Sequence, residues 1–270
     1  MRARMQSPTP LPAPRSWLAI GPGALGGNPV REWPNVGSRF YFQHLWMPLT
    51  IFAGLSVVLM GLHGDLWLAD RLYAMEGHAW NLQTGYLTQD LLHASGRQAS
   101  KDMWFTLALM VGISLLVRQA RQWRRPLVYL LLATALSTAA VSLLKRWTNV
   151  DCPWDLLRYG GDKAYYNLFM HRPSILGHAK CFPAGHASAG YAWIALYFFF
   201  LSTRPRWRWW GLGFALGLGA IFGVAQQLRG AHFLSHDLWA LMICWLIALA
   251  LYLLMLGHRR TSDPSVQGAR

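Results

Sequence analysis

The 270-residue chain is 54% hydrophobic and only 13% charged, whereas soluble domains carry about 25% charged residues. This deficit, together with long apolar runs, excludes an ordinary soluble domain and predicts an integral membrane protein. The net charge of +14 comes largely from arginines clustered between apolar segments. Because these arginines do not line one polar face, the charge pattern argues against nucleic-acid binding.

Six apolar segments predict an all-α fold, a six-helix transmembrane bundle. A membrane-crossing helix needs about 20 residues, so the second and fourth segments are short unless flanking residues extend them. The segments cover roughly residues 44–62, 104–117, 127–144, 187–202, 209–228 and 237–256.

Outside these segments the chain is polar. No apolar stretch lies near Met1, so we expect no cleavable signal peptide and interpret residues 1–38 as an Arg- and Pro-rich cytoplasmic tail. Residues 39–258 form the predicted membrane domain. Residues 259–270 are expected to be a disordered cytoplasmic C-terminus.

Arginine clusters predict the orientation. With six spans, all four clusters fall on one side, which is then the cytoplasm, because cytoplasmic loops are enriched in Lys and Arg. We therefore expect both termini in the cytoplasm. The clustered arginines are Arg2, Arg4, Arg15, Arg31, Arg39, Arg118, Arg121, Arg124, Arg125, Arg204, Arg206, Arg208, Arg259 and Arg260.

The opposite side receives three connections, about 63–102, 145–186 and 229–236. Reactive residue types gather at the ends of the spans that flank them. The three clusters run from Lys145 to Pro153, from Pro183 to His186, and from Arg229 to Asp237.

These residue types suit a phosphate ester. Lys145 supplies a point charge and Arg229 a planar fork for phosphate oxygens. Gly185 lets the backbone approach closely, and a helix beginning near residue 187 would favour an anion. Of two histidines, one can attack phosphorus as a neutral imidazole while the other protonates the leaving oxygen.

Each residue alone has a simpler interpretation. Lys145 is of a kind that usually anchors a span end, and the turn before His186 is a common helix entry. His232 or His236 fits an interfacial packing residue or a metal ligand. The functional interpretation depends on convergence, since ionisable groups at membrane depth are rare without function.

The clusters resemble the three motifs of the type-2 phosphatidic acid phosphatase superfamily, K-x6-R-P, P-S-G-H and S-R-x5-H-x3-D. Lys145 and Pro153 match the first motif, and Pro183, Gly185 and His186 match the second. The resemblance covers about residues 127–245. It implies a six-span membrane phosphatase that needs no metal or other cofactor.

In the third motif His232 matches the family's nucleophile, which forms a phosphohistidine, and the resemblance makes His186 the general acid. The implied partners are a lipid phosphate substrate and the bilayer. The implied location is a bacterial inner membrane with a periplasmic active site. Oligomeric state stays open.

Four positions depart from the motifs. Cys152 stands at the first-motif Arg, Ala184 at the second-motif Ser, Gln226 at the third-motif Arg and His236 at the third-motif Asp.

Local substitutes are available for three of these departures. Arg229 shares a helical face with Gln226, and His236 or Asp237 can hold the ring of His232. Arg158 or Arg172 is expected to fold in for the arginine missing at position 152.

Two cysteines lie in the same predicted extracytoplasmic connection. Because a bacterial envelope is oxidising, we predict a disulfide between Cys152 and Cys181 that pins Lys145 near His186. Two unpaired thiols are the alternative. Cys244 lies in an apolar run and is expected to be buried.

The leading hypothesis is hydrolysis of a lipid phosphate or diphosphate. The family suggests undecaprenyl diphosphate, phosphatidylglycerol phosphate, phosphatidic acid or lipid A phosphate. The alternatives are a lipid-to-lipid phosphotransferase, a haem- or metal-binding membrane protein, and a non-catalytic member of the family. The sequence does not separate the hydrolase from the phosphotransferase.

Overall fold

The computed structural model describes residues 37–257 except 87 and 89–94. Most of the predicted tail (residues 1–36) and all of the predicted C-terminal segment lie outside the described residues. Within them every regular element is helical, apart from one isolated parallel bridge between Leu156 and Lys163. The prediction of an all-α protein is therefore confirmed.

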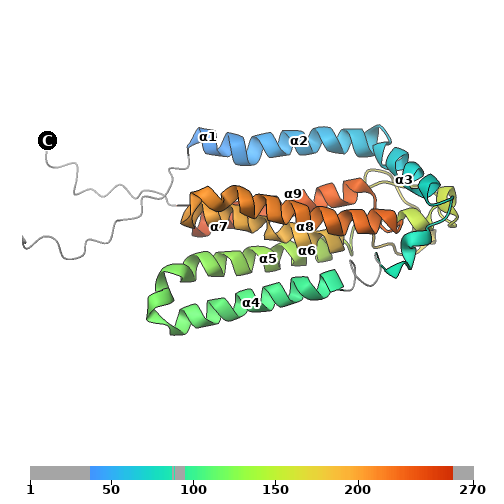
Figure 1. Ribbon diagram of the computed structural model, residues 1–270. Helices are drawn as coiled ribbons and strands as arrows, with labels where there is room; N and C mark the ends of the chain where they lie inside the picture. Colours follow the sequence, from blue (N-terminus) through green and yellow to red (C-terminus); the bar gives the residue numbers. More distant parts are fainter. Residues whose placement is uncertain (1–36, 87, 89–94, 258–270) are drawn as a thin grey trace, which may run out of the picture. The chain divides into compact units, whose positions relative to one another are not determined.

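Long helices account for most of the described chain (Figure 1). The first is continuous from Ser38 to Gly61, with two π-helical stretches inside it. The others come in the order α3, α4, α5, α6–α7, α8 and α9. Their bounds are α1 Ser38–Tyr41, η1 Phe42–Trp46, α2 Met47–Ser56, η2 Val57–Gly61, α3 Gly64–Met75, α4 Gly96–Leu116, α5 Arg124–Leu144, α6 Gly185–Tyr191, η9 Ala192–Ile194, α7 Ala195–Thr203, α8 Arg208–Leu228 and α9 Leu234–Met255.

Five helices of the described residues are long and apolar enough to cross a membrane, one fewer than predicted. They are Ser38–Gly61, Gln98–Leu116, Arg118–Leu144, Pro205–Leu228 and Leu234–Met255. The fourth predicted segment is also helical, but the 3-10 turn η9 divides it into α6 and α7. With five candidate spans, the chain is a multi-pass membrane protein.

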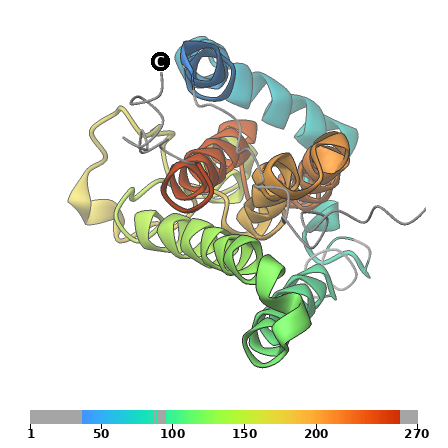
Figure 2. The same cartoon turned by 90° about the vertical axis from the view of Figure 1, so that its left-hand side faces the viewer.

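Helix α9 lies at the centre of the packing. It contacts α2, α5, α6, α7 and α8, whereas α4 packs on α5 and α6. Viewed along the helices, α9 lies between the first helix and α5 (Figure 2). The core around it is built from aromatic and small side chains, including the fully buried Tyr129, Phe198 and Tyr252. The Tyr129 hydroxyl donates a hydrogen bond to the Ala248 carbonyl over 3.1 Å.

Helices α6 and α8 approach each other so closely that glycine is required at the crossing. A Cβ atom on Gly190 would lie 2.5 Å from the Gly219 nitrogen, and one on Gly219 would lie 2.1 Å from the ring of Tyr191. Small residues at such crossings let helix backbones approach inside a membrane. This contact holds the start of α6, which carries His186, against α8.

The ends of the bundle differ. The α4–α5 connection, which holds the arginine cluster at 118–125, lies at the end where α1 begins, and α3 lies at the other end (Figure 1). Helix α3 was not predicted. It packs on α8 and α9, and Asp65 near its start accepts a hydrogen bond from the Ser235 N–H over 2.9 Å.

Candidate active site

A cavity of about 610 Å³ opens where the end of α5, the start of α6 and the α8–α9 connection meet. We call it the histidine cavity. Residues from all three sequence clusters line it, although they are far apart in the chain. The predicted site residues among its lining are Lys145, Cys152, Cys181, Gly185, His186, Gln226, Arg229 and His232.

Lys145 lies at the C-cap of α5, where its N–H continues the helical hydrogen bonds to the Val141 carbonyl. Its ammonium group lies beside Gly185, since a Cβ on Gly185 would be 3.6 Å from Nζ. Burial lowers the pKa of Lys145 from its ordinary value. The charge of Lys145 is therefore only partly solvated and is directed at the turn that precedes His186.

His232 is buried, and its Nδ1 atom lies 3.3 Å from Nδ1 of His236. Burial lowers the pKa of His232 well below its ordinary value, and the positive charges of Lys145, His236 and His186 act in the same direction. At neutral pH the imidazole of His232 is therefore uncharged, as a nucleophile must be. The Nδ1 atom of His232 is thus engaged by His236.

Two candidates were predicted to hold the His232 ring, and the structure brings only His236 to it. The Asp237 carboxylate instead accepts a hydrogen bond from the Gln227 side chain over 2.5 Å. It also fills the space beside Gly223 on α8, where a Cβ would lie 2.4 Å from Oδ2. Asp237 is not among the residues that line the histidine cavity.

Arg229 reaches the cavity from the end of α8, as its spacing from Gln226 predicts. One guanidinium nitrogen donates a hydrogen bond to the Gln226 side chain over 3.2 Å, and another donates to the Gln83 carbonyl over 2.9 Å. The guanidinium is thus held in place by an unpredicted contact with the connection that follows α3.

The prediction that Arg158 or Arg172 replaces the arginine missing at position 152 is wrong. Arg158 forms a two-pronged ion pair with Asp70 on α3, with both distances 2.6 Å. Arg172 forms another with buried Asp151, at 2.6 and 2.9 Å. Each guanidinium meets a carboxylate of matching geometry nearer than the cavity.

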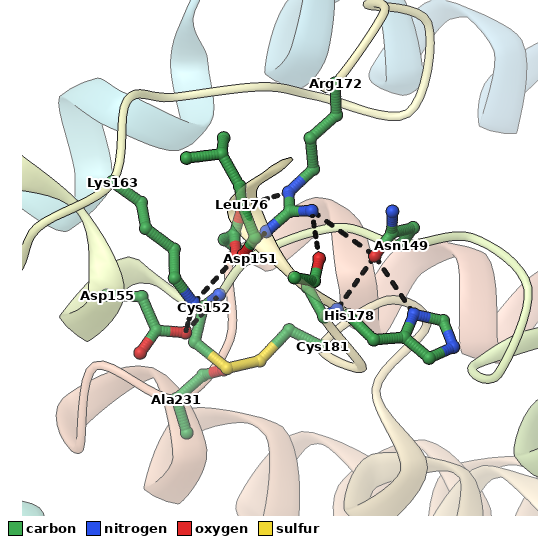
Figure 3. A network of polar contacts seen from close by, with 12 residues as sticks. Asn149, Asp151, Cys152, Asp155, Lys163, Arg172, Leu176, His178, Cys181 and Ala231 are labelled. Carbon is green, nitrogen blue, oxygen red and sulfur yellow. Dashed lines mark hydrogen bonds and ion pairs between the residues drawn. A yellow bond between two sulfur atoms is a disulfide. The ribbon is translucent and has the colours of Figure 1, made fainter. Parts of the chain in front are cut away.

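Cys152 and Cys181 are joined by a disulfide, with their Cα atoms 5.3 Å apart. Around it Asp151, Lys163 and Arg172 form a network of ion pairs (Figure 3). The bridge links the end of the first cluster to the start of the second at the wall of the histidine cavity. Cys244 is a buried free thiol, as predicted.

Sequence reasoning missed two residues near the site. Asp65 caps the start of α9, the helix that carries His236, and burial raises the pKa of Asp65 to about 6. Lys180 lines the histidine cavity. One signal in the sequence could have pointed to Lys180. It directly precedes Cys181, which was predicted to form a disulfide with Cys152 in the first motif. No signal pointed to Asp65, because its partner Ser235 is 170 positions away.

Together these features define a multi-pass membrane protein with a cationic, histidine-lined cavity at the end of its helices. A family model described as the PAP2 superfamily matches residues 126–260, half of the chain. The chain belongs to the PAP2 superfamily, a family of phosphatases found mainly in membranes. No curated protein and no solved structure matches the chain significantly.

Proposed function

We propose that the protein hydrolyses a lipid phosphate or diphosphate through a phosphohistidine intermediate. The observation that carries the proposal is the meeting of His186, His232, Lys145 and Arg229 in one cavity. Two imidazoles and two cations at one site match the needs of phosphoryl transfer, in which positioning and charge stabilisation dominate.

In the first step Nε2 of His232 attacks phosphorus, and the bond from phosphorus to the lipid oxygen breaks. His186 gives its proton to that oxygen, so that the lipid leaves as an alcohol or as a monophosphate. Lys145 and Arg229 hold the non-bridging oxygens, whose negative charge they balance. His236 keeps the His232 ring in the attacking orientation.

In the second step a water molecule attacks the phosphohistidine. His186, now neutral, accepts a proton from the water as the nitrogen–phosphorus bond breaks. Inorganic phosphate leaves, and His232 returns as a neutral imidazole. Both histidines regain their starting protonation states.

A lipid substrate is favoured by a second cavity of about 540 Å³ between α4, α5 and η9. Trp104, Phe105 and Trp193 line it, and it shares Thr138 and Ala189 with the histidine cavity. A lipid whose phosphate occupies the histidine cavity can therefore extend its apolar tail into the second cavity, alongside the helices.

The arginine-rich α4–α5 connection lies at the opposite end from α3 (Figure 1). Because the histidine cavity lies at the α3 end, the positive-inside bias supports an extracytoplasmic location for it. We propose that this face is the periplasmic face of a bacterial inner membrane. Cytoplasmic termini require an even number of crossings, so in this proposal α6, η9 and α7 together make the sixth crossing beside the five long helices.

The test is phosphate release by the purified protein in detergent, with EDTA, from phosphatidic acid, phosphatidylglycerol phosphate and undecaprenyl diphosphate. Wild type and a His171→Ala control, which removes an exposed histidine, are expected to be active. His232→Ala is expected to lose about 1,000-fold or more. Rapid quenching with labelled substrate should trap an acid-labile phosphoprotein.

Equal rates for wild type and His232→Ala would overturn the proposal. Activity that EDTA abolishes would indicate a metal enzyme. If label passes to an added acceptor lipid with no free phosphate, the protein is a phosphotransferase.

A further inference from the structure

The departure at Cys152 removes a cation from the wall of the histidine cavity. Three of the basic residues that follow it along the connection do not restore that charge, because Arg158, Lys163 and Arg172 are each ion-paired with an aspartate. A doubly charged phosphate would then have less positive charge on this side than the first motif of the family provides.

Lys180 supplies a cation at the same wall. It lines the histidine cavity together with Cys152 and Cys181, and Lys180 is exposed to solvent. Within the described part of the chain it forms no ion pair. An exposed lysine keeps its four-carbon stem flexible, so its ammonium group can move towards an anion that enters the cavity.

The backbone on both sides of Lys180 is fixed. The Ala179 N–H donates to the Asn149 side chain over 2.8 Å, and the Cys181 N–H donates to the Val150 carbonyl over 3.0 Å. The disulfide adds a covalent link from Cys181 to Cys152. Figure 3 shows the neighbours on either side, with His178 in contact with Asn149 and Cys181 bonded to Cys152.

We infer that Lys180 is a phosphate-binding residue of the histidine cavity and that the Cys152–Cys181 disulfide positions it there. The bridge uses position 152, where the family has arginine, to bring in a cation from 28 residues further along the chain. This inference rests on the proposed function, since the ligand is the phosphate group of that substrate.

The experiment compares wild type, Lys180→Ala, Lys180→Arg and a control, Arg71→Ala. Arg71 is an exposed cation of α3 outside the cavity lining. Loss of Lys180 is expected to raise KM for the lipid phosphate about 10-fold, with a smaller change in kcat, because a charged hydrogen bond to the ground state is lost. Lys180→Arg should restore KM, and Arg71→Ala should leave it unchanged.

A direct binding measurement needs no turnover. Inorganic phosphate should protect wild type from thermal unfolding, and Lys180→Ala should need about 10-fold more phosphate for the same protection. Dithiothreitol or Cys152→Ser should weaken binding similarly, and Lys180→Ala should add little in the Cys152→Ser background.

Unchanged KM and unchanged protection in Lys180→Ala would overturn the inference, as would a wild type that phosphate does not protect. Independent effects of Lys180→Ala and Cys152→Ser would reject the positioning role of the disulfide. Failure of the proposed function looks different, since wild type would then release no phosphate from any lipid.

Discussion

The Nδ1 atoms of His232 and His236 lie 3.3 Å apart in the interior of the site. Only one of the two nitrogens can carry the shared proton, so the pair fixes the ring orientation of His232 with an imidazole where the family motif has a carboxylate. Residue 236 thus contacts the ring of His232 through a chemical group that differs from the carboxylate of the motif.

This relationship predicts the behaviour of substitutions at position 236. His236→Phe keeps the ring beside Phe182 but removes the nitrogen, so kcat should fall about 10- to 100-fold with little change in KM. His236→Asp restores the residue of the family motif and should keep most of the activity. Steady-state kinetics on both variants provide the measurement, and equal kcat in His236→Phe and wild type would contradict the positioning role.

Asp65 predicts a pH dependence of stability. Burial raises the pKa of Asp65 to about 6, so its contribution to stability is full below the ordinary carboxyl pKa and is lost as the pH rises through about 6. Asp65→Asn keeps an oxygen to cap Ser235 but does not titrate. The melting temperature of wild type relative to Asp65→Asn should therefore fall between about pH 4 and about pH 7.

Asp70 provides a matched control, because its effect on stability should change with pH in the opposite direction. The hydrogen bond from Arg158 lowers the pKa of Asp70, so its contribution is present above the ordinary carboxyl pKa and is lost as the pH falls. Wild type should therefore lose stability relative to Asp70→Asn on acidification. A melting-temperature difference for Asp65→Asn that does not vary with pH would show that the carboxyl does not titrate in this range.

The ion pairs of the long connection should differ in strength. Asp151 and Arg172 are both buried as side chains, whereas Arg158 is exposed and Asp70 is half-buried. Arg172→Ala leaves a buried carboxylate with Lys163 alone and should destabilise the protein by about 3 kcal/mol. Arg158→Ala should cost at most about 1 kcal/mol. Thermal unfolding in detergent compares the two, and equal losses would contradict the burial argument.

The crossing of α6 and α8 predicts a contrast between two glycines. Gly190→Ala would put a Cβ 2.5 Å from the backbone of Gly219, so the helices must separate, at about 2 kcal/mol. At Gly213 on α8 a Cβ would meet no neighbouring atom within 4 Å, so Gly213→Ala should be neutral or slightly stabilising. The measurement is thermal unfolding, and equal stability of the two variants would show that the crossing tolerates a methyl group.

Local sequence determined the apolar helices, the all-α class and the identity of the reactive clusters. Hydropathy and motif spacing involve neighbours along one chain segment, so Lys145, His186 and His232 could be identified from the sequence alone. The same reasoning counted six spans, whereas five described helices are long and apolar enough to cross a membrane. The difference is the fourth segment, because its local sequence pattern does not reveal that the 3-10 turn η9 divides it into α6 and α7.

Tertiary structure decided which groups meet. Successive residues on a helix point about 100° apart, so whether His236 or Asp237 faces His232 depends on how α9 is rotated against α8. Likewise, Arg158 and Arg172 pair with Asp70 and Asp151, partners set by the packing of α3 and the long connection. Such contacts join residues tens of positions apart, and only the packed chain brings them within hydrogen-bonding distance.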